Sequence, residues 1–475
     1  MPNDPANTDT LPGPAILYET DQGVALDASI LRIARHHIAF QVHTPGVTPR
    51  LSQVWENFRI VLSGKQVYEG RATLQSIVDA GAGWICEAKL EDAWLDFLPP
   101  GRNGAQPRKS FGDYIRESQL FRIRPEFKLV IADMQALLHD LRHWTEQLEL
   151  FIPAETAQRE HALEKELLQG ACQEALPCLA AAFERFEILA HDLDPREVPA
   201  HAAYAKRQLH PLVLCAPFMY RTFKKPLGYA GDYEMVNMMV RDPLEGATAF
   251  AKVLNAFFLN TPPVVAHRNR IMRLKGMLVE ELLRCAGGGS RVRLLDIGCG
   301  PACEIAEIVK TSPLSSSADI TLLDFNQETL DYAGAQLTAL IKQNHRSTRV
   351  RLLRRSVTQL LKDAAKINLG LAREQYEVVY CAGLFDYMPD AVCREILSLA
   401  YKMLAPGGLL LATNVDACNP SRGWMELVVD WHLIYRTAKE FRKLVPAIAD
   451  PESCRIYSEE SAVNVFLEIR KPRNV

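Results

Sequence analysis

The sequence predicts a multidomain protein with an α/β core at the carboxyl end, preceded by a helical region and a small β-rich domain. Three observations support this prediction. Apolar strand-like runs alternate with helix-compatible stretches after residue 286, amphipathic stretches fill residues 115–285, and short apolar runs separated by glycines fill residues 15–97. At 475 residues the chain is also too long for one ordinary domain.

The amino-terminal domain is predicted from strands separated by glycine turns. Residues 61–70 and 71–79 form two such strands with a turn at Gly70, and residues 84–90 continue the pattern. The region resembles the small PilZ-type barrel that binds cyclic dinucleotides. The arginine pair and the Asp-x-Ser-x-x-Gly element of that family are not recognisable, and Asp79-Ala-Gly-Ala-Gly, the nearest approach, lacks the serine. A barrel that serves packing or protein contact is therefore favoured over a nucleotide sensor.

The helical region follows a linker rich in proline and glycine, residues 98–114. Residues 127–150 and 158–193 are long and amphipathic, and only Pro177 interrupts the second stretch. These helices could form a substrate lid or a homodimer surface, and the sequence does not distinguish the two. The polar residues 1–14 are predicted to be a disordered tail.

Residues 291–300, Arg-Val-Arg-Leu-Leu-Asp-Ile-Gly-Cys-Gly, give the strongest functional signal. The apolar run predicts a buried strand, and residues 304–309 predict the helix that follows it. Gly298 and Gly300 allow a sharp turn and a close approach of the backbone to a ligand. The free N–H groups of the helix would point at the same place. Because ligands bind at such strand ends in open α/β sheets, this segment predicts a cofactor site.

The next predicted strand, residues 320–324, ends at Asp324. Its carboxylate can accept hydrogen bonds from ribose hydroxyls, and Phe325 beside it can cover an adenine face. Residues 350–357, 376–387 and 405–414 complete the series, the last with a Pro-Gly-Gly turn. A third glycine at the dinucleotide spacing and a phosphate-binding loop are both missing from the sequence, which disfavours dinucleotide enzymes and NTPases.

This series resembles the class I S-adenosylmethionine (SAM)-dependent methyltransferases, which have a Rossmann-like core. A core that has lost its ligand is disfavoured because four motifs occur in order. The resemblance implies that Asp296 and Glu304 support the amino group of SAM, that the glycine turn lines its methionine part, and that Asp324 binds the ribose. The family often carries an acidic residue near the third strand end, where this chain has Ser356 and Val357. The predicted cofactor-binding residues are Asp296, Gly298, Cys299, Gly300, Glu304, Asp324, Phe325, Ser356, Val357, Ala382 and Gly383.

A second informative segment, Gly-Tyr-Ala-Gly-Asp-Tyr at residues 228–233, interrupts the helical region. Such a loop could close over a bound cofactor, because tyrosine faces attract a sulfonium cation and Asp232 adds negative charge. The alternative is a tight corner between helices in which Asp232 caps the second helix.

Two further segments offer acceptor-site candidates. Arg268 or Arg270 could position a carboxylate through its planar guanidinium. Residues 424–436 are interpreted as a helix that places His432, Tyr435 and Arg436 on one face, where packing against the sheet competes with a general-base role for His432. The predicted catalytic residues are Tyr229, Asp232, Tyr233, Arg268 and His432.

The segment at 228–233 followed by this core is similar to bacterial methyltransferases that make 3-hydroxypalmitic acid methyl ester, or its shorter homologue, as a quorum-sensing signal. This resemblance implies O-methylation of the carboxylate of a 3-hydroxy fatty acid. Two alternatives remain open. One is a methyltransferase for another small acceptor, an amine, phenol or hydroxyl. The other is a regulator that binds SAM or a cyclic dinucleotide without turnover.

The composition is that of an ordinary globular protein, with 48% hydrophobic residues and a net charge of −3. This charge argues against a nucleic-acid partner. We expect no transmembrane segment, because no apolar run has the required length. Eleven cysteines without metal-ligand spacing, together with an amino terminus unlike a signal peptide, predict reduced thiols, no metal site and a cytoplasmic location.

Overall fold

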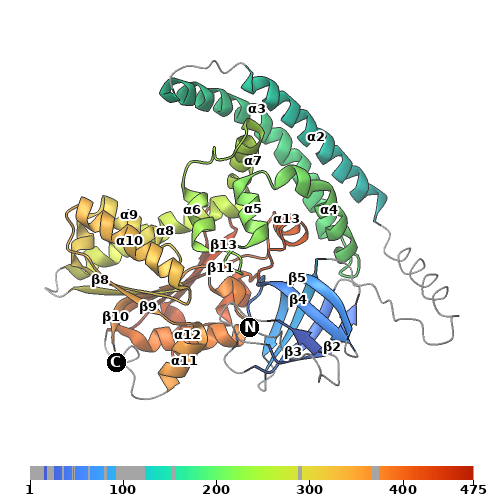
Figure 1. Cartoon of the computed structure of the whole chain (residues 1–475). Helices are drawn as coiled ribbons and strands as arrows, with labels where there is room; N and C mark the ends of the chain where they lie inside the picture. Colours follow the sequence, from blue (N-terminus) through green and yellow to red (C-terminus); the bar gives the residue numbers. More distant parts are fainter. Residues whose placement is uncertain are drawn as a thin grey trace, which may run out of the picture.

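The computed structural model describes residues 15–18, 26–34, 37–44, 47, 49–62, 65–79, 83–91, 123–150, 157–286, 291–365 and 374–473. In these ranges a β-barrel, a helical unit and an α/β domain lie against one another (Figure 1). The predicted tail at 1–14 and linker at 98–114 lie outside the described residues. Among the helices of the described ranges, none has both the length and the apolar character needed to cross a membrane.

The amino-terminal barrel is closed, with strand order β1-β2-β3-β6-β5-β4. Its core contains the buried side chains of Phe40, Trp55 and Phe58. The predicted turn at Gly70 is wrong, because β5 continues through this residue. A Cβ at Gly70 would lie 2.7 Å from the hydroxyl of Tyr68, so the glycine makes room for that side chain. The strands are β1 (Ala15–Leu17), β2 (Ala28–Ala34), β3 (His37–Val42), β4 (Val54–Leu62), β5 (Lys65–Asp79) and β6 (Trp84–Leu90).

The helical unit is built on the long hairpin of α2 and α3, which projects from the rest of the molecule (Figure 1). Helix α3 continues through Pro177. The core includes Phe183, Phe258 and Trp424, whose indole reaches in from the α/β domain with its centre 4.4 Å from the Phe183 ring. The helices are α2 (Pro125–Glu149), α3 (Ala157–His191), α4 (Val198–Val213), α5 (Pro217–Lys224), α6 (Tyr233–Val240), α7 (Ala249–Leu259) and α8 (Pro262–Cys285).

The α/β domain contains a seven-stranded sheet of order β12-β13-β11-β10-β7-β8-β9. The five strands from β9 to β11 are parallel, and β13 is antiparallel to both β11 and β12. The strand order reverses between β7 and β10, so the ends of these strands form a crevice suited to a ligand. The strands are β7 (Val292–Ile297), β8 (Ala318–Asp324), β9 (Arg349–Arg354), β10 (Tyr376–Cys381), β11 (Leu404–Val415), β12 (Cys454–Ser458) and β13 (Asn464–Arg470).

Helices cover this sheet on both faces, so the predicted Rossmann-like core is confirmed, as is a β-rich domain at the amino end. A PilZ identity for that domain stays a prediction. The α-helices are α9 (Cys303–Thr311), α10 (Gln327–Gln343), α11 (Val357–Ala365), α12 (Asp390–Met403), α13 (Arg422–Leu427) and α14 (Ala438–Arg442), and the 3₁₀ turns are η2 (Pro313–Ser317), η4 (Phe385–Tyr387) and η5 (Pro451–Ser453).

Two sequence interpretations need correction here. Strand β9 ends at Arg354, and residues 357–365 are helical instead of continuing the strand. The helix expected over residues 424–436 is limited to α13, and residues 428–437 run in non-helical conformation. Asp430 has a left-handed φ of 49°, which a helix cannot accommodate. His432 and Tyr435 therefore do not share a helical face.

The barrel is joined to both other units by polar contacts. The amide of Val54 donates to the carbonyl of Gly228 at 2.9 Å, and the hydroxyl of Ser52 donates to the carbonyl of His432 at 2.8 Å. The guanidinium of Arg71 donates to the carbonyl of Phe223. These bonds fix the barrel segment 50–54 beside the 228–233 loop.

Candidate active site

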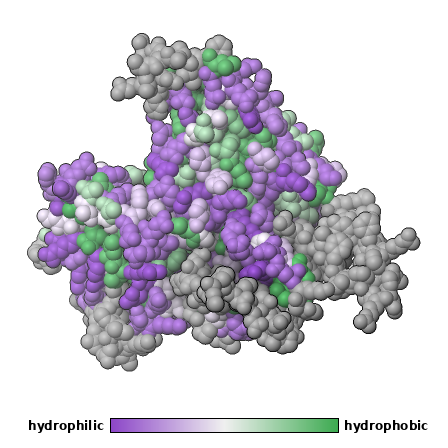
Figure 2. All heavy atoms as spheres, in the orientation of Figure 1, coloured by the Kyte–Doolittle hydropathy of each residue, from purple (hydrophilic) through white to green (hydrophobic). Residues whose placement is uncertain are grey.

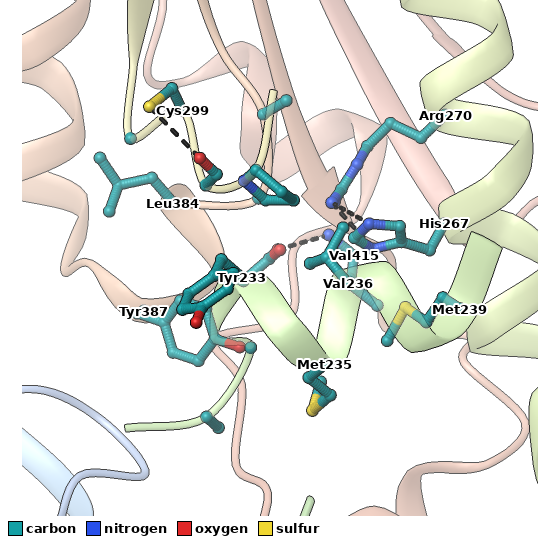
Figure 3. A pocket seen from close by; sticks show the side chains of 18 of the residues that line it. Tyr233, Met235, Val236, Met239, His267, Arg270, Cys299, Leu384, Tyr387 and Val415 are labelled. Carbon is teal, nitrogen blue, oxygen red and sulfur yellow. Dashed lines mark hydrogen bonds between the residues drawn. The ribbon is translucent and has the colours of Figure 1, made fainter. Parts of the chain in front are cut away.

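A pocket lies at the carboxyl ends of β7, β8 and β10. Helices α6 and α8, the 228–233 loop and the barrel segment around Arg50 form its other walls. Figure 3 shows side chains from α6 and α8 pointing into it, opposite the turn that carries Cys299. The site is therefore built jointly by all three units.

The turn after β7 exposes backbone atoms to the pocket, because two of its residues are glycines without side chains. Gly298 and Gly300 have φ values of +78° and +51°, which glycine adopts without strain. The amides of Gly298 and Cys299 donate to the carbonyl of Leu323 at 2.8 and 3.1 Å, and this fixes the turn against β8. A Cβ at Gly300 would meet no heavy atom within 4 Å, so a ligand can approach the backbone there.

Asp324 lies beside this turn. Its two carboxylate oxygens accept hydrogen bonds from the amides of Gly300 at 3.3 Å and Asn326 at 2.9 Å. Each oxygen has two lone pairs, so capacity remains for ribose hydroxyls. The geometry agrees with the ribose-binding role that the resemblance implies.

Two buried carboxyl groups lie at the bottom of the pocket. The Oδ2 atom of Asp296 is buried and has no hydrogen-bond partner, whereas Glu304 accepts from the hydroxyl of Tyr380 at 2.8 Å. Burial raises the pKa of both groups, and the nearby Glu304 raises the pKa of Asp296 further. A cation bound here would stabilise their ionised forms. The ammonium and sulfonium groups of SAM fit this requirement.

The opposite side of the pocket holds a paired arginine and histidine. Nη2 of Arg270 lies 2.9 Å from Nδ1 of His267 (Figure 3). Burial and the nearby Arg270 hold the pKa of His267 well below its usual value, so the imidazole is neutral and accepts the hydrogen bond. The guanidinium packs against Gly383, where an added Cβ would lie 2.9 Å from Nη2. Arg270 thus lies beside Gly383, one of the predicted cofactor-binding residues.

Asp386 is a further polar group in this wall. Its Oδ1 accepts from the amide of Val415 at 2.7 Å, and burial raises its pKa to about 6. The lining also includes the polar residues Tyr387 and Asn464 and many apolar ones, among them Met235, Val236, Met239, Pro263, Val264, Ile271, Leu274, Met388, Met425, Trp431 and Leu433.

The structure separates the predicted catalytic residues into two groups. Tyr229 and Tyr233 line the pocket. The Tyr229 ring lies 5.0 Å from the Phe325 ring, and the Tyr233 hydroxyl donates to Glu328 at 2.8 Å. Asp232 does not line the pocket. Its carboxylate caps α6 through the amide of Met235 and binds Arg221, so the capping alternative describes its position.

Arg268 and His432 do not line the pocket either. The Arg268 guanidinium donates to the carbonyls of Leu259 at 2.7 Å and Met239 at 3.1 Å, and so ties neighbouring helices together. The His432 ring lies 3.1 Å from the amide nitrogen of Gln75 in the barrel. Burial lowers the pKa of His432 to about 3, which keeps it neutral in this contact.

Nine of the predicted cofactor-binding residues line the pocket, and two do not. Ser356 accepts through its hydroxyl from the amide of Gln359 at 3.2 Å at the start of α11, and Val357 is the first residue of that helix. The nine lining residues are Asp296, Gly298, Cys299, Gly300, Glu304, Asp324, Phe325, Ala382 and Gly383.

Several residues that line the pocket are not among the predicted site residues, among them Arg50, Leu51 and Asp386. Arg50 and Leu51 come from the barrel, and no sequence signal links them to a site more than two hundred residues away. Asp386 could have been found, because it follows β10 just as Asp324 ends β8.

Comparisons with known proteins agree with this geometry. Residues 295–410 match the model of a family described as a methyltransferase domain. No curated protein matches the chain. The match and the pocket geometry identify a methyltransferase domain in this part of the chain, and SAM is the cofactor that the lining of the pocket fits.

Solved structures show only distant similarity. A possible exported protein from Bordetella parapertussis is 17% identical, with coverage of 67% of this chain and 100% of the other and a TM-score of 0.39. The magnesium protoporphyrin IX methyltransferase of Synechocystis PCC 6803 is 14% identical, covering 45% and 87%, with a TM-score of 0.32. The N-methyltransferase NodS of Bradyrhizobium japonicum is 14% identical, covering 53% and 99%, with a TM-score of 0.30.

Proposed function

We propose that the enzyme transfers the methyl group of SAM to the carboxylate of a 3-hydroxy fatty acid and so forms a methyl ester. The observation that carries this proposal is the position of Arg270. Its guanidinium lies against Gly383 and near the carboxyl groups of Asp386 and Glu304, in a pocket with many apolar lining residues. A cation at the end of an apolar cavity is complementary to an acid with an acyl chain.

The reaction makes modest demands on the protein. The acid is already ionised near neutral pH, so no strong base is needed. Bound SAM supplies an electrophilic methyl group on its sulfonium. Asp324 and the glycine turn would hold the ribose and methionine parts, and Arg270 would orient the carboxylate. Hydrogen bonds from Arg270 to the carboxylate of the acid would reduce the nucleophilicity of that carboxylate. Because one guanidinium nitrogen of Arg270 already donates to His267, fewer N–H groups are left to do so. The apolar wall keeps water out of the site.

The test incubates the full chain with methyl-labelled SAM and a series of 3-hydroxy fatty acids of increasing length. We expect a labelled, base-labile ester, with one chain length preferred. Matched fatty alcohols and amines are the control acceptors and should stay unlabelled. If no acid in the series yields an ester while SAM is bound, the proposal fails.

Asp386 favours a second candidate, a hydroxyl or amine acceptor. A carboxyl with a pKa of about 6 is largely ionised at neutral pH and can accept a proton from such a group. Asp386→Asn separates the two candidates. It should abolish methylation of a hydroxyl or amine, whereas ester formation on an already ionised acid does not need this base.

We also propose that a homodimer forms through the helical unit. Large apolar side chains are exposed there, among them Leu129, Trp144, Leu150 and Ile188. Figure 2 shows an apolar area over this unit amid a mostly hydrophilic surface. Light scattering on the full chain, with Trp144→Glu and Ile188→Glu as variants, tests this pairing. A monomer at all concentrations would exclude it.

A further inference from the structure

The barrel contributes an arginine to the cofactor end of the pocket. The Arg50 guanidinium carbon lies 3.2 Å from the centre of the Phe325 ring and 5.9 Å from the centre of the Tyr229 ring. All three residues line the same pocket. Burial lowers the pKa of Arg50 to about 10 against the opposing effect of the Asp324 carboxylate, so the guanidinium is charged at neutral pH.

The chain around Arg50 is held in place. The Arg50 amide donates to the side-chain carbonyl of Gln53 at 3.0 Å. The Val54 amide donates a hydrogen bond to the carbonyl of Gly228, next to Tyr229. The Ser52 hydroxyl is hydrogen-bonded to the backbone carbonyl and amide of His432. The position of the guanidinium is therefore coupled to the packing of the barrel against the other two units.

Phe325 directly follows Asp324, the residue expected to bind the ribose, and Phe325 also lines the pocket, so we expect the adenine to contact its ring. A guanidinium 3.2 Å above the ring fills the space that a stacked base requires. We propose that Arg50 competes with the adenine of SAM for the face of Phe325 and thereby sets the affinity for the cofactor from the barrel. Binding of SAM must displace the guanidinium. Any ligand or contact that moves residues 50–54 therefore changes the affinity for SAM, and SAM changes the affinity for that ligand by the same factor.

This inference goes beyond the proposed acceptor chemistry, because it concerns only the donor side. It is tested by measuring the dissociation constants of adenosine, S-adenosylhomocysteine and SAM by calorimetry with Arg50→Ala. Loss of a desolvated cation–π contact should tighten adenosine and S-adenosylhomocysteine binding by roughly tenfold. Arg59→Ala, an exposed arginine of β4, is the matched control and should leave all three constants unchanged.

The three ligands distinguish competition for the face of Phe325 from electrostatic repulsion between Arg50 and a positively charged ligand. SAM carries a net positive charge, whereas adenosine and S-adenosylhomocysteine are neutral overall. If only SAM binds more tightly, charge repulsion explains the effect and the proposal is overturned. Weaker adenosine binding would mean that Arg50 stacks on the base, and this also overturns it. When Phe325→Leu is already present, Arg50→Ala should no longer tighten the binding of adenosine. If the alanine variant fails to fold, Arg50→Gln repeats the test with a side chain longer than alanine.

Discussion

Nη2 of Arg270 lies 2.9 Å from Nδ1 of His267, one turn earlier on the same helix. The imidazole is neutral, so it holds the guanidinium by accepting a hydrogen bond and does not repel it. This contact directs a buried cation toward Gly383, where acceptor and donor would meet. Asp386 and Glu304 are the carboxyl groups that interact with this charge from the other elements of the pocket.

Arg270→Ala should raise the KM for the fatty acid. The loss of a charged hydrogen bond to the carboxylate costs about 2–3 kcal/mol, which corresponds to roughly 30- to 150-fold. Binding of S-adenosylhomocysteine should change little. Arg273→Ala, an exposed residue of the same helix, is the control. An unchanged KM for the acid would show that its carboxylate does not meet Arg270.

Gly383→Ala should damage the acceptor site more than the donor site. Gly383 has a φ of +87°, and an added Cβ would push against both terminal nitrogens of Arg270 at 2.9 and 3.0 Å. We expect a stability loss of about 1–3 kcal/mol from the backbone strain and a raised KM for the acid. Gly300→Ala has comparable strain but open space at its Cβ, so it should instead weaken SAM binding. Steady-state kinetics with each substrate varied distinguish the two patterns.

Donor binding should depend on pH through Asp296. Burial first, and then the neighbouring Glu304, raises the pKa of this carboxyl well above its usual value. The ammonium of S-adenosylhomocysteine favours the ionised form, so binding releases a proton and affinity rises with pH until the carboxyl is ionised in the free enzyme. Calorimetry in two buffers of different ionisation enthalpy measures this release. Adenosine, which lacks the ammonium, should show none, and Asp296→Asn should reduce the release seen with S-adenosylhomocysteine.

Asp430→Asn should weaken the junction of the three units. Asp430 forms buried ion pairs with Lys89 of the barrel at 3.0 Å and Lys206 of α4 at 2.5 Å. Although burial opposes ionisation, these lysines hold the pKa of Asp430 well below its usual value. Asparagine preserves the shape and tolerates the left-handed backbone, so the change isolates the charge. Removing one partner of a buried ion pair costs about 3–5 kcal/mol.

Denaturant unfolding of Asp430→Asn measures this loss. A second substitution, Lys89→Met, should recover part of it, because it removes one of the unpaired charges. If the single variant is as stable as the parent, the lysines find other partners and the junction does not depend on Asp430.

The cofactor half of the site could be predicted because it is local in sequence. Strand β7, its glycine turn and the first turn of α9 are contiguous, and Asp324 ends the neighbouring parallel strand. Ser356 and Val357 do not line the pocket, because the strand expected to reach Val357 ends three residues earlier, at Arg354, and a helix begins at Val357. The expectation rested on a family pattern at the third strand, not on these side chains.

The acceptor half depends on tertiary contacts that periodicity does not reveal. The sequence alone does not distinguish Arg268 from Arg270. Because the two arginines are two residues apart on α8, their side chains point in directions that differ by about 200° at 3.6 residues per turn. Only Arg270 therefore faces the pocket. Residues 428–437 have helix-compatible composition, yet the charge of Asp430 and the barrel contacts of His432 hold them in another conformation. Arg50 belongs to a different domain, the amino-terminal barrel.

The indole of Trp424 fills the centre of the helical unit, between Phe183 and Phe258, although it belongs to the last part of the chain. During synthesis the helices emerge from the ribosome long before this side chain exists. Their core therefore stays incomplete until residue 424 has been synthesised, so the helical unit completes its packing together with the sheet of the α/β domain instead of before it.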